Sequence, residues 1–165
     1  MPRAGFAGDE LGSALIGSRL VRDAMSLCFL TEKRYAPYPK WFGSTFSRLA
    51  CASQLTPLLL HAQQATTWQE RQAALCLAYT LLAKMHNALG LTDPLPTETG
   101  SFHGRPFMVI HAERFSQALS EKITDPEVNR IAAKGLIGSL DQLSDNTDLR
   151  SHVSWRPAIR HLYED

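Results

Sequence analysis

The chain of 165 residues is 44% hydrophobic and 20% charged, which is the composition of an ordinary folded globular domain. Its 17 Lys and Arg residues are opposed by 16 Asp and Glu residues. The resulting formal net charge of +1 gives no general electrostatic reason to bind nucleic acid, and we expect no DNA partner.

Residues 1–8 are expected to form a loose N-terminal tail. From Gly8 to Arg34 the apolar residues recur at near-helical spacing, which predicts a long helix. This helix should end before Pro37 and Pro39, because the residue before a proline is pushed out of the α region.

Two shorter helices are expected next. One begins near Trp41 or Phe42, where apolar residues follow at spacings of four and three. The other has Pro57 in its first turn, a position that suits a residue without a backbone N–H.

The clearest helix signal runs from Thr67 to Leu89. Thr67 and Glu70 match a capping box, in which each side chain bonds the backbone N–H of the other residue. The apolar stripe that follows is broad and almost continuous around the helix, so we expect this helix at the centre of the fold. Gly90 is a natural residue to end it.

The C-terminal half begins with a loop at 91–106, which contains three prolines. A helix is expected from about Phe107 to Lys122, and another starts with Asp125 as its N-cap and Pro126 as its first residue. A last helix is expected at 155–163. The predicted fold class is therefore all-α: the whole chain is one domain, a bundle of about six or seven helices.

The three cysteines, Cys28, Cys51 and Cys76, each lie in an apolar stretch and are far apart in the sequence. We expect them to be reduced and buried. No Cys or His spacing is typical of zinc, and we expect neither a metal nor a cofactor. The first ten residues lack the apolar core of a signal peptide, and the longest uncharged apolar run is too short to cross a bilayer. The sequence therefore predicts a cytoplasmic protein without a membrane partner.

The stretch "RYAPYPKWFG", residues 34–43, concentrates aromatic rings and cations between two helices. Two prolines stiffen it and lower the entropy lost when it becomes ordered. We expect its four rings to pack under the central helix. A rigid turn would also hold Lys40 still, as one wall of a site.

The candidate site is a pocket for a small anion such as a phosphate or carboxylate. Lys40 and Arg105 are expected to point into a common cleft beside His86, and Asp23 is expected to balance their charge. His86 and Asn87 would line the pocket at the end of the central helix, although capping of helix carbonyls is the alternative. The candidate substrate-binding residues are Arg19, Arg22, Asp23, Tyr35, Tyr38, Lys40, Trp41, His86, Asn87 and Arg105.

The segment "GSLDQLSDNTD" has a superficial likeness to the Gly-Ser and Asp-x-Asp signature of nucleotidyltransferases, which hold Mg²⁺ with adjacent carboxylates. Asp145 and Asp148 are three residues apart, so on a strand they would point to opposite faces. A turn rich in Asx residues is the favoured interpretation, and we expect no metal there.

The motifs "GDELGSALIGSRLVRDAMSLCFL", "RYAPYPKWFG", "HNALGL", "GRPF" and "IGSLDQLSDNTD" occur in this order. Together they resemble an uncharacterised bacterial family, the domain of unknown function 4037, from about Gly8 to Tyr163. The resemblance implies that this helical region follows a nucleotidyltransferase-like domain in longer members. That domain would carry the catalytic motif, which is not found in this chain, so no catalytic residue carries over.

The leading expectation is a substrate-binding or accessory helical domain that is not a complete enzyme by itself. Its partner would be a separate nucleotidyltransferase-like chain or a small anionic ligand, and a homodimer is also considered. One alternative is a dimeric helical ribonuclease that uses Arg156 and His161, whose spacing occurs in such enzymes. The other is a structural module for protein interaction, which would need an exposed apolar patch and no polar pocket.

Overall fold

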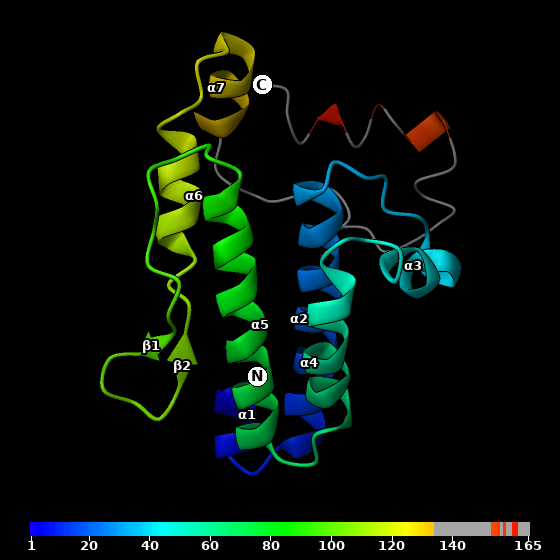
Figure 1. The fold of residues 1–165 in the computed structure, drawn as a ribbon, viewed down its shortest axis with the longest axis vertical. Helices are drawn as coiled ribbons and strands as arrows, with labels where there is room; N and C mark the ends of the chain where they lie inside the picture. Colours follow the sequence, from blue (N-terminus) through cyan, green and yellow to red (C-terminus); the bar gives the residue numbers. More distant parts are fainter. Residues whose placement is uncertain (134–152, 156, 158–159, 162–165) are drawn as a thin grey trace. The chain divides into compact units, whose positions relative to one another are not determined.

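The computed structural model describes residues 1–133, 153–155, 157 and 160–161 of the chain. Contacts divide the chain into two compact units, residues 1–119 and 120–165, and each is described by itself. The described residues contain seven α-helices and one short antiparallel hairpin, which confirms the predicted class and helix number. The elements are α1 (Pro2–Phe6), α2 (Glu10–Thr31), α3 (Pro39–Phe46), α4 (Ala52–Gln64), α5 (Trp68–Ala88), β1 (Gly100–Ser101), β2 (Met108–Val109), α6 (Glu113–Ser120), α7 (Pro126–Ala133) and a 3-10 turn, Val153–Trp155 (Figure 1).

Helix α5 is the centre of the larger unit, where it contacts α1, α2, α4 and β2. Its first turn contains the predicted capping box: Thr67 Oγ1 accepts a hydrogen bond from Glu70 N–H, and the Glu70 carboxylate accepts one from Thr67 N–H. Gly90 follows the helix with a φ of +63°, a conformation that glycine adopts at little cost. The predicted start, end and central place of this helix are confirmed.

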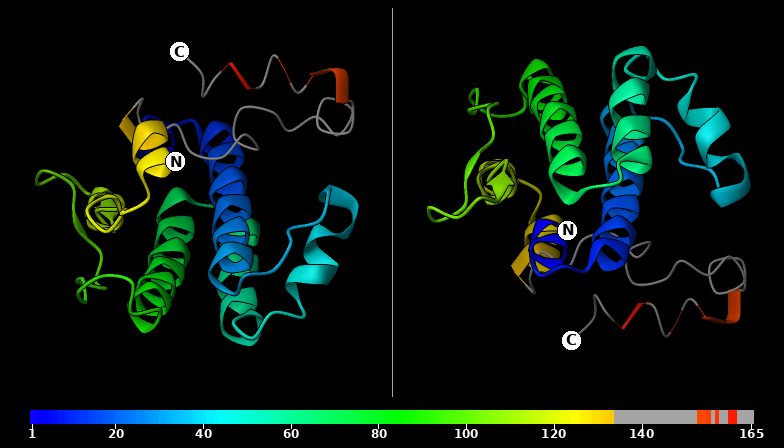
Figure 2. Two further views of the ribbon diagram at one scale, coloured as in Figure 1. Left: turned by 90° about the horizontal axis from the view of Figure 1, so that it is seen from above. Right: turned by 90° about the horizontal axis from the view of Figure 1, so that it is seen from below.

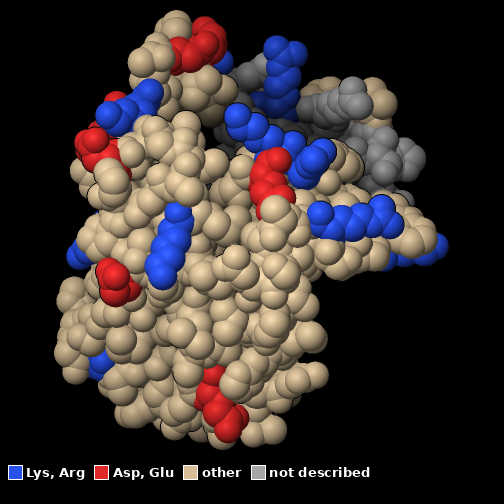
Figure 3. Space-filling view, in the orientation of Figure 1, with Lys and Arg blue, Asp and Glu red and all other residues tan. Residues whose placement is uncertain are grey.

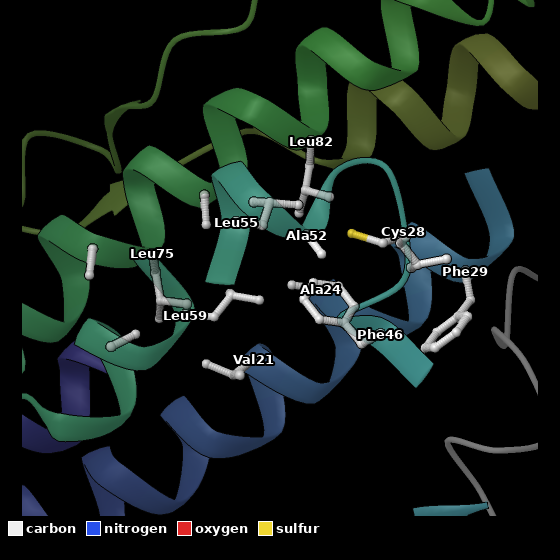
Figure 4. Packing of buried hydrophobic residues seen from close by; sticks show 14 residues of the cluster. Val21, Ala24, Cys28, Phe29, Phe46, Ala52, Leu55, Leu59, Leu75 and Leu82 are labelled. Carbon is white, nitrogen blue, oxygen red and sulfur yellow. The ribbon is translucent and has the colours of Figure 1, made fainter. Parts of the chain in front are cut away.

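The hydrophobic core lies among α2, α4 and α5, with one fully buried ring from α3 (Figure 4). Phe29, Leu55 and Leu75 are among the largest completely buried side chains, and they come from three different helices. Phe46 joins them from α3, with its ring centroid 6.4 Å from that of Phe29. Each such side chain contributes about 1.5–3 kcal/mol on burial, so this three-helix contact holds the unit together.

Residues 1–8 are not the loose tail expected from the sequence, because α1 packs against both α2 and α5. Gly5 lies directly on Trp68, and a Cβ atom at this position would overlap the tryptophan side chain. The Phe6 ring makes edge-to-face contacts with Trp68 and Phe107, at centroid distances of 6.2 and 5.6 Å. Partners far along the chain therefore order this segment, and a local sequence pattern does not reveal them.

Two predicted helix starts are wrong. Helix α4 begins at Ala52, so Pro57 lies inside the helix and not in its first turn. Helix α6 begins at Glu113 and not near Phe107. Phe107 is buried beside the hairpin, and this burial holds the residues after it in an extended strand.

The predicted start of α7 is confirmed in the second unit. Asp125 Oδ1 accepts hydrogen bonds from the N–H groups of Glu127 and Val128, over 2.8 and 3.0 Å. The helix expected at 155–163 lies mostly outside the described residues.

The aromatic stretch at 34–43 does not pack as expected. Phe42 contacts Phe29 at a centroid distance of 5.2 Å, and Phe46, one turn later, reaches the core. The three remaining rings are exposed to solvent: Tyr35, Tyr38 and Trp41. Because α3 has only eight residues and buries one face, the two phenylalanines four residues apart occupy that face and Trp41 is turned away from it.

Candidate ligand-binding groove

Two adjoining cavities, of about 520 and 290 Å³, lie in the larger unit between α2, α5 and the segment from β2 to α6. They share four wall residues, Leu20, Tyr79, Ile110 and Ala112, and together form one groove. In Figure 1 the covering segment runs along the side of α5 that faces away from α4, and the two views of Figure 2 agree.

The β-hairpin fixes the covering segment on α5. Phe107 is buried against Trp68, with ring centroids 6.1 Å apart. The Gln72 side chain accepts a hydrogen bond from Met108 N–H over 2.9 Å and donates one to the Pro106 carbonyl over 3.4 Å. These contacts place residues 109–112 over the groove, and an edge-to-face contact between Phe115 and His86 holds α6.

The loop after α5 is attached by the two predicted residues at the end of that helix. The Asn87 side-chain amide donates to the Leu95 carbonyl over 2.8 Å and accepts from Leu95 N–H over 3.0 Å. His86 Nε2 lies 2.9 Å from Thr92 Oγ1, whose own proton is donated to the Asp93 carbonyl. His86 Nε2 is therefore the donor in this contact, which leaves Nδ1 of the neutral ring as an acceptor.

The smaller cavity has few polar groups, and they come from different helices. Asp23 and Thr31 lie on α2, and Tyr79 and His86 lie on α5. Burial, with smaller contributions from the nearby Cys76 and Asp23, raises the pKa of Tyr79 to about 12, so the phenol is neutral at physiological pH. Neither the Tyr79 hydroxyl nor the Asp23 carboxylate forms a hydrogen bond with another residue of the described part of the chain.

The larger cavity is lined mainly by apolar side chains together with Gln72, Cys76, His111 and Glu113. His111 Nδ1 lies 3.2 Å from Glu113 Oε1, at the start of α6. Within the described ranges, no group of three or more His, Cys, Asp or Glu side chains is arranged to hold a metal ion.

The structure brings two of the predicted site residues together, since Asp23 and His86 line the same cavity. Lys40 and Arg105 do not join them. Lys40 lies on α3 and Arg105 in the turn between β1 and β2, and these elements are on opposite sides of the bundle (Figure 2). The prediction of a common cleft for these two cations is therefore wrong, because the hairpin folds back along α5, away from α3.

The other predicted residues are distributed over the surface of the larger unit. Lys40 Nζ lies 5.2 Å from the centroid of the exposed Trp41 ring, and neither residue lines the groove. Arg19 is exposed and Arg22 is half-exposed, and neither lines the groove. Tyr35 and Tyr38 are exposed beside α3.

Several other candidate residues lie outside the described residues. These are Gly138, Ser139, Asp141, Asp145, Asp148 and Arg156. His161 is described and is exposed.

A third cavity, of about 590 Å³, has a different composition, with Glu32, Arg34 and Lys84 among its lining residues. The Glu32 carboxylate accepts hydrogen bonds from Ala50 N–H over 3.0 Å and Cys51 N–H over 2.9 Å. Both carboxylate oxygens of Glu32 thus accept hydrogen bonds from backbone N–H groups at the start of α4. We interpret Glu32 as a cap of this helix and not as part of a ligand site.

Charged side chains are sparse over α4 on the face shown in Figure 3. The sequence of α4 contains no Asp, Glu, Lys or Arg. Leu60 on α4 and Leu77 on α5 are both more than half exposed. Leu60, on the uncharged helix α4, therefore supplies exposed apolar surface of the kind that the interaction-module alternative requires.

Tyr79 is the residue of the groove that sequence reasoning missed. It lies seven residues before His86, so both occupy one face of α5 after two turns. A polar aromatic residue two helical turns before His86, on the same face of α5, was the available signal. The covering residues Ile110 and Phe115 gave no comparable signal, because a long-range contact of Phe107 places them.

Residues 1–42, which include α1, α2 and the beginning of α3, match the family model described as Domain of unknown function (DUF4037). This match confirms the family resemblance over these residues. No curated protein and no solved structure matches the chain. Among the helices of the described residues, none has the length and apolar character needed to cross a membrane.

Proposed function

We propose that residues 1–119 form an accessory unit that binds a small molecule and acts together with a nucleotidyltransferase-like domain or chain. The groove carries the binding part of this proposal: two adjoining cavities, apolar on most of their walls, with a few convergent polar groups. Small-molecule sites in proteins are usually of this size and composition. The connection to a nucleotidyltransferase, and a bacterial origin, rest on the family resemblance.

In this proposal the residues of the larger unit bind the ligand and do not catalyse a reaction. The polar groups of the groove would bind and orient the ligand. The Tyr79 phenol stays neutral, and the His86 ring is fixed by its hydrogen bond with Thr92. A cytoplasmic location is part of the proposal and is supported by Cys28, Cys51 and Cys76 being free thiols.

Protein-observed NMR with a fragment library tests whether the groove binds small molecules. Binding is expected to shift the amide resonances of Tyr79, His86 and Ile110. Ala112→Trp should abolish these shifts, because Ala112 lines both cavities and a large ring there fills them. Ala73→Trp is the matched control, since Ala73 is exposed on α5 and lines neither cavity. A library without any fragment that shifts these amides would rule out the proposed function.

The partner part is tested with a chain that carries the Gly-Ser and Asp-x-Asp signature. Mixing the two proteins is expected to give a complex in sedimentation, and Ala112→Trp should lower nucleotidyl transfer without preventing assembly. Full transfer by the partner in the absence of this chain would contradict the accessory role.

The structural-module alternative is favoured by one observation: the α4 surface has no Asp, Glu, Lys or Arg residue, and its Leu60 is more than half exposed. A second copy of this chain suits such a face, because two identical neutral surfaces do not repel each other. Sedimentation equilibrium distinguishes this alternative: a dimer that Leu60→Glu dissociates supports it, and a monomer excludes it. The ribonuclease alternative with Arg156 and His161 stays a prediction.

A further inference from the structure

We infer that the smaller cavity binds a ligand with a protonated amine on an apolar body. This inference rests on the proposed function and names the class of molecule that the groove takes. It reverses the sign of charge expected from the sequence, which suggested a phosphate or carboxylate.

The charge of the cavity is the first reason. Among the described residues that line the smaller cavity, Asp23 is the one with an Asp, Glu, Lys or Arg side chain. The cations that were expected to surround an anion, Arg19, Arg22, Lys40 and Arg105, are absent from its walls. An anionic ligand would lie beside a carboxylate with no cation to compensate, which is unfavourable at low local dielectric.

The free hydrogen-bonding capacity of the cavity is the second reason. The Asp23 carboxylate offers acceptors only, and it has no hydrogen-bond partner among the described residues. His86 adds an acceptor at Nδ1, because its Nε2–H is donated to Thr92. The Tyr79 hydroxyl is available to accept or donate. An alkylammonium group presents up to three N–H donors and no acceptor, which complements this set.

The apolar walls are the third reason. Most of the surface around these polar groups is aliphatic or aromatic, with Leu27, Leu82, Ile110 and Phe115 among its larger side chains. A fully hydrated polycation would leave this surface unused. A single ammonium joined to an alkyl or aryl group satisfies the carboxylate and also buries apolar area.

Three probes of nearly equal shape test the inference: 4-phenylbutylamine, 4-phenylbutanol and 4-phenylbutyrate. Isothermal titration calorimetry at neutral pH, with NMR to locate the site, measures their affinities for the full chain. We expect the amine to bind the groove about tenfold or more tightly than the alcohol, since a charge-assisted hydrogen bond in a partly buried site contributes this much. The carboxylate should bind most weakly.

Asp23→Asn should reduce amine affinity to about that of the alcohol, and the circular dichroism spectrum of the variant reports whether its fold is intact. Asp9→Asn is the matched control, because it makes the same chemical change at the N-cap of the same helix, where Asn caps equally well. Tyr79→Phe should weaken the amine less than Asp23→Asn does.

Several outcomes would overturn the inference: equal binding of amine and alcohol, no effect of Asp23→Asn, preferred binding of the carboxylate, or no binding of any of the three. The first three leave the groove as a ligand site, so the proposed function stands. If none of the three binds, the fragment screen decides separately whether the groove binds anything.

Discussion

Ser13 and Arg71 meet in the interior of the larger unit, where Arg71 Nη1 donates a hydrogen bond to Ser13 Oγ over 2.8 Å. The Arg71 side chain is only 3% exposed, and Ser13 is completely buried. Arg71 also donates to Glu10 over 3.3 Å and to the Ala65 carbonyl over 2.8 Å. Gly17 makes room for it, since a Cβ there would overlap the arginine chain. One buried cation thus ties α2 to the start of α5.

Arg71→Ala is expected to lower the free energy of unfolding by about 3–5 kcal/mol, because it leaves buried partners unsatisfied and removes packed methylene groups. Arg19→Ala, the same change at an exposed arginine of α2, should cost about 0.5 kcal/mol or less. Urea unfolding followed by circular dichroism measures both. Equal stability of the two variants would show that the buried hydrogen bonds add nothing net to folding.

The pKa of Glu32 is lowered in the folded protein. Burial acts to raise it, but hydrogen bonds from the N–H groups of Cys51 and Ala50, with a smaller effect of Arg34, outweigh burial. Because the folded value lies below the unfolded one, Glu32 stabilises the protein above the unfolded pKa of about 4.3. This stabilisation is lost as the pH falls through the folded value.

Glu32→Gln should therefore destabilise the protein at neutral pH and much less in acid. The difference in unfolding free energy between natural protein and variant is expected to shrink from about pH 6 to about pH 3. Asp93→Asn, at an exposed position on the loop after α5, is the control and should show no such trend. A difference that stays constant with pH would mean that the charge of Glu32 does not matter for its contact with α4.

The thiols should react slowly in the folded state. Burial raises the pKa of Cys28 to about 11 and also raises those of Cys51 and Cys76. Since the thiolate is the reactive form, a value near 11 instead of about 9 leaves about a hundredfold less of it at neutral pH. Only Cys28 is completely buried; the other two are half-buried, which corrects the prediction that all three are buried.

Labelling with a disulfide reagent at neutral pH measures this protection. Cys28 is expected to react on the timescale of unfolding, and in urea all three thiols should react at once. Rapid labelling of Cys28 in the native protein would show that α2 and α4 separate readily at this point.

The start of a helix was predictable where a local capping signal determines it. Examples are the capping box of Thr67 and Glu70 at α5 and the N-cap Asp125 at α7. Among the residues of the groove, Asp23 and His86 were predicted correctly, because they lie on long helices whose faces the sequence specifies. Where distant contacts decide, prediction failed. Phe107 turns a segment that was expected to be helical into a strand because it packs on Trp68.

The anion pocket failed for the same reason. Lys40 and Arg105 have the right chemistry, but the distance between them depends on which way the hairpin folds along α5. The sequences around Lys40 and Arg105 do not indicate in which direction the hairpin folds. Without Lys40 and Arg105, Asp23 determines the charge of the smaller cavity. The wrong prediction of where the hairpin lies therefore also gave the wrong charge for the expected ligand.

The short helix α3 allows a direct test of which aromatic residue fastens the 34–43 stretch to the core. The sequence predicts that the rings of this stretch are buried, and replacing a buried Trp41 ring with alanine would cost about 3–5 kcal/mol. The ring is 52% exposed, so the loss should instead be about 1 kcal/mol or less. Phe46→Ala should cost about 3–5 kcal/mol, because that ring is buried among α2, α4 and α5.

The two variants lie on one eight-residue helix and remove an aromatic ring each, so backbone propensity affects them similarly. Chemical unfolding of both, with Lys40→Ala as a third variant, separates ring burial from the cation–π contact between Lys40 and Trp41. Because that contact is at the surface, Lys40→Ala is expected to change stability by less than about 0.5 kcal/mol. Trp41→Ala as costly as Phe46→Ala would mean that the exposed ring is covered in solution, which the arrangement of α3 in this structure contradicts.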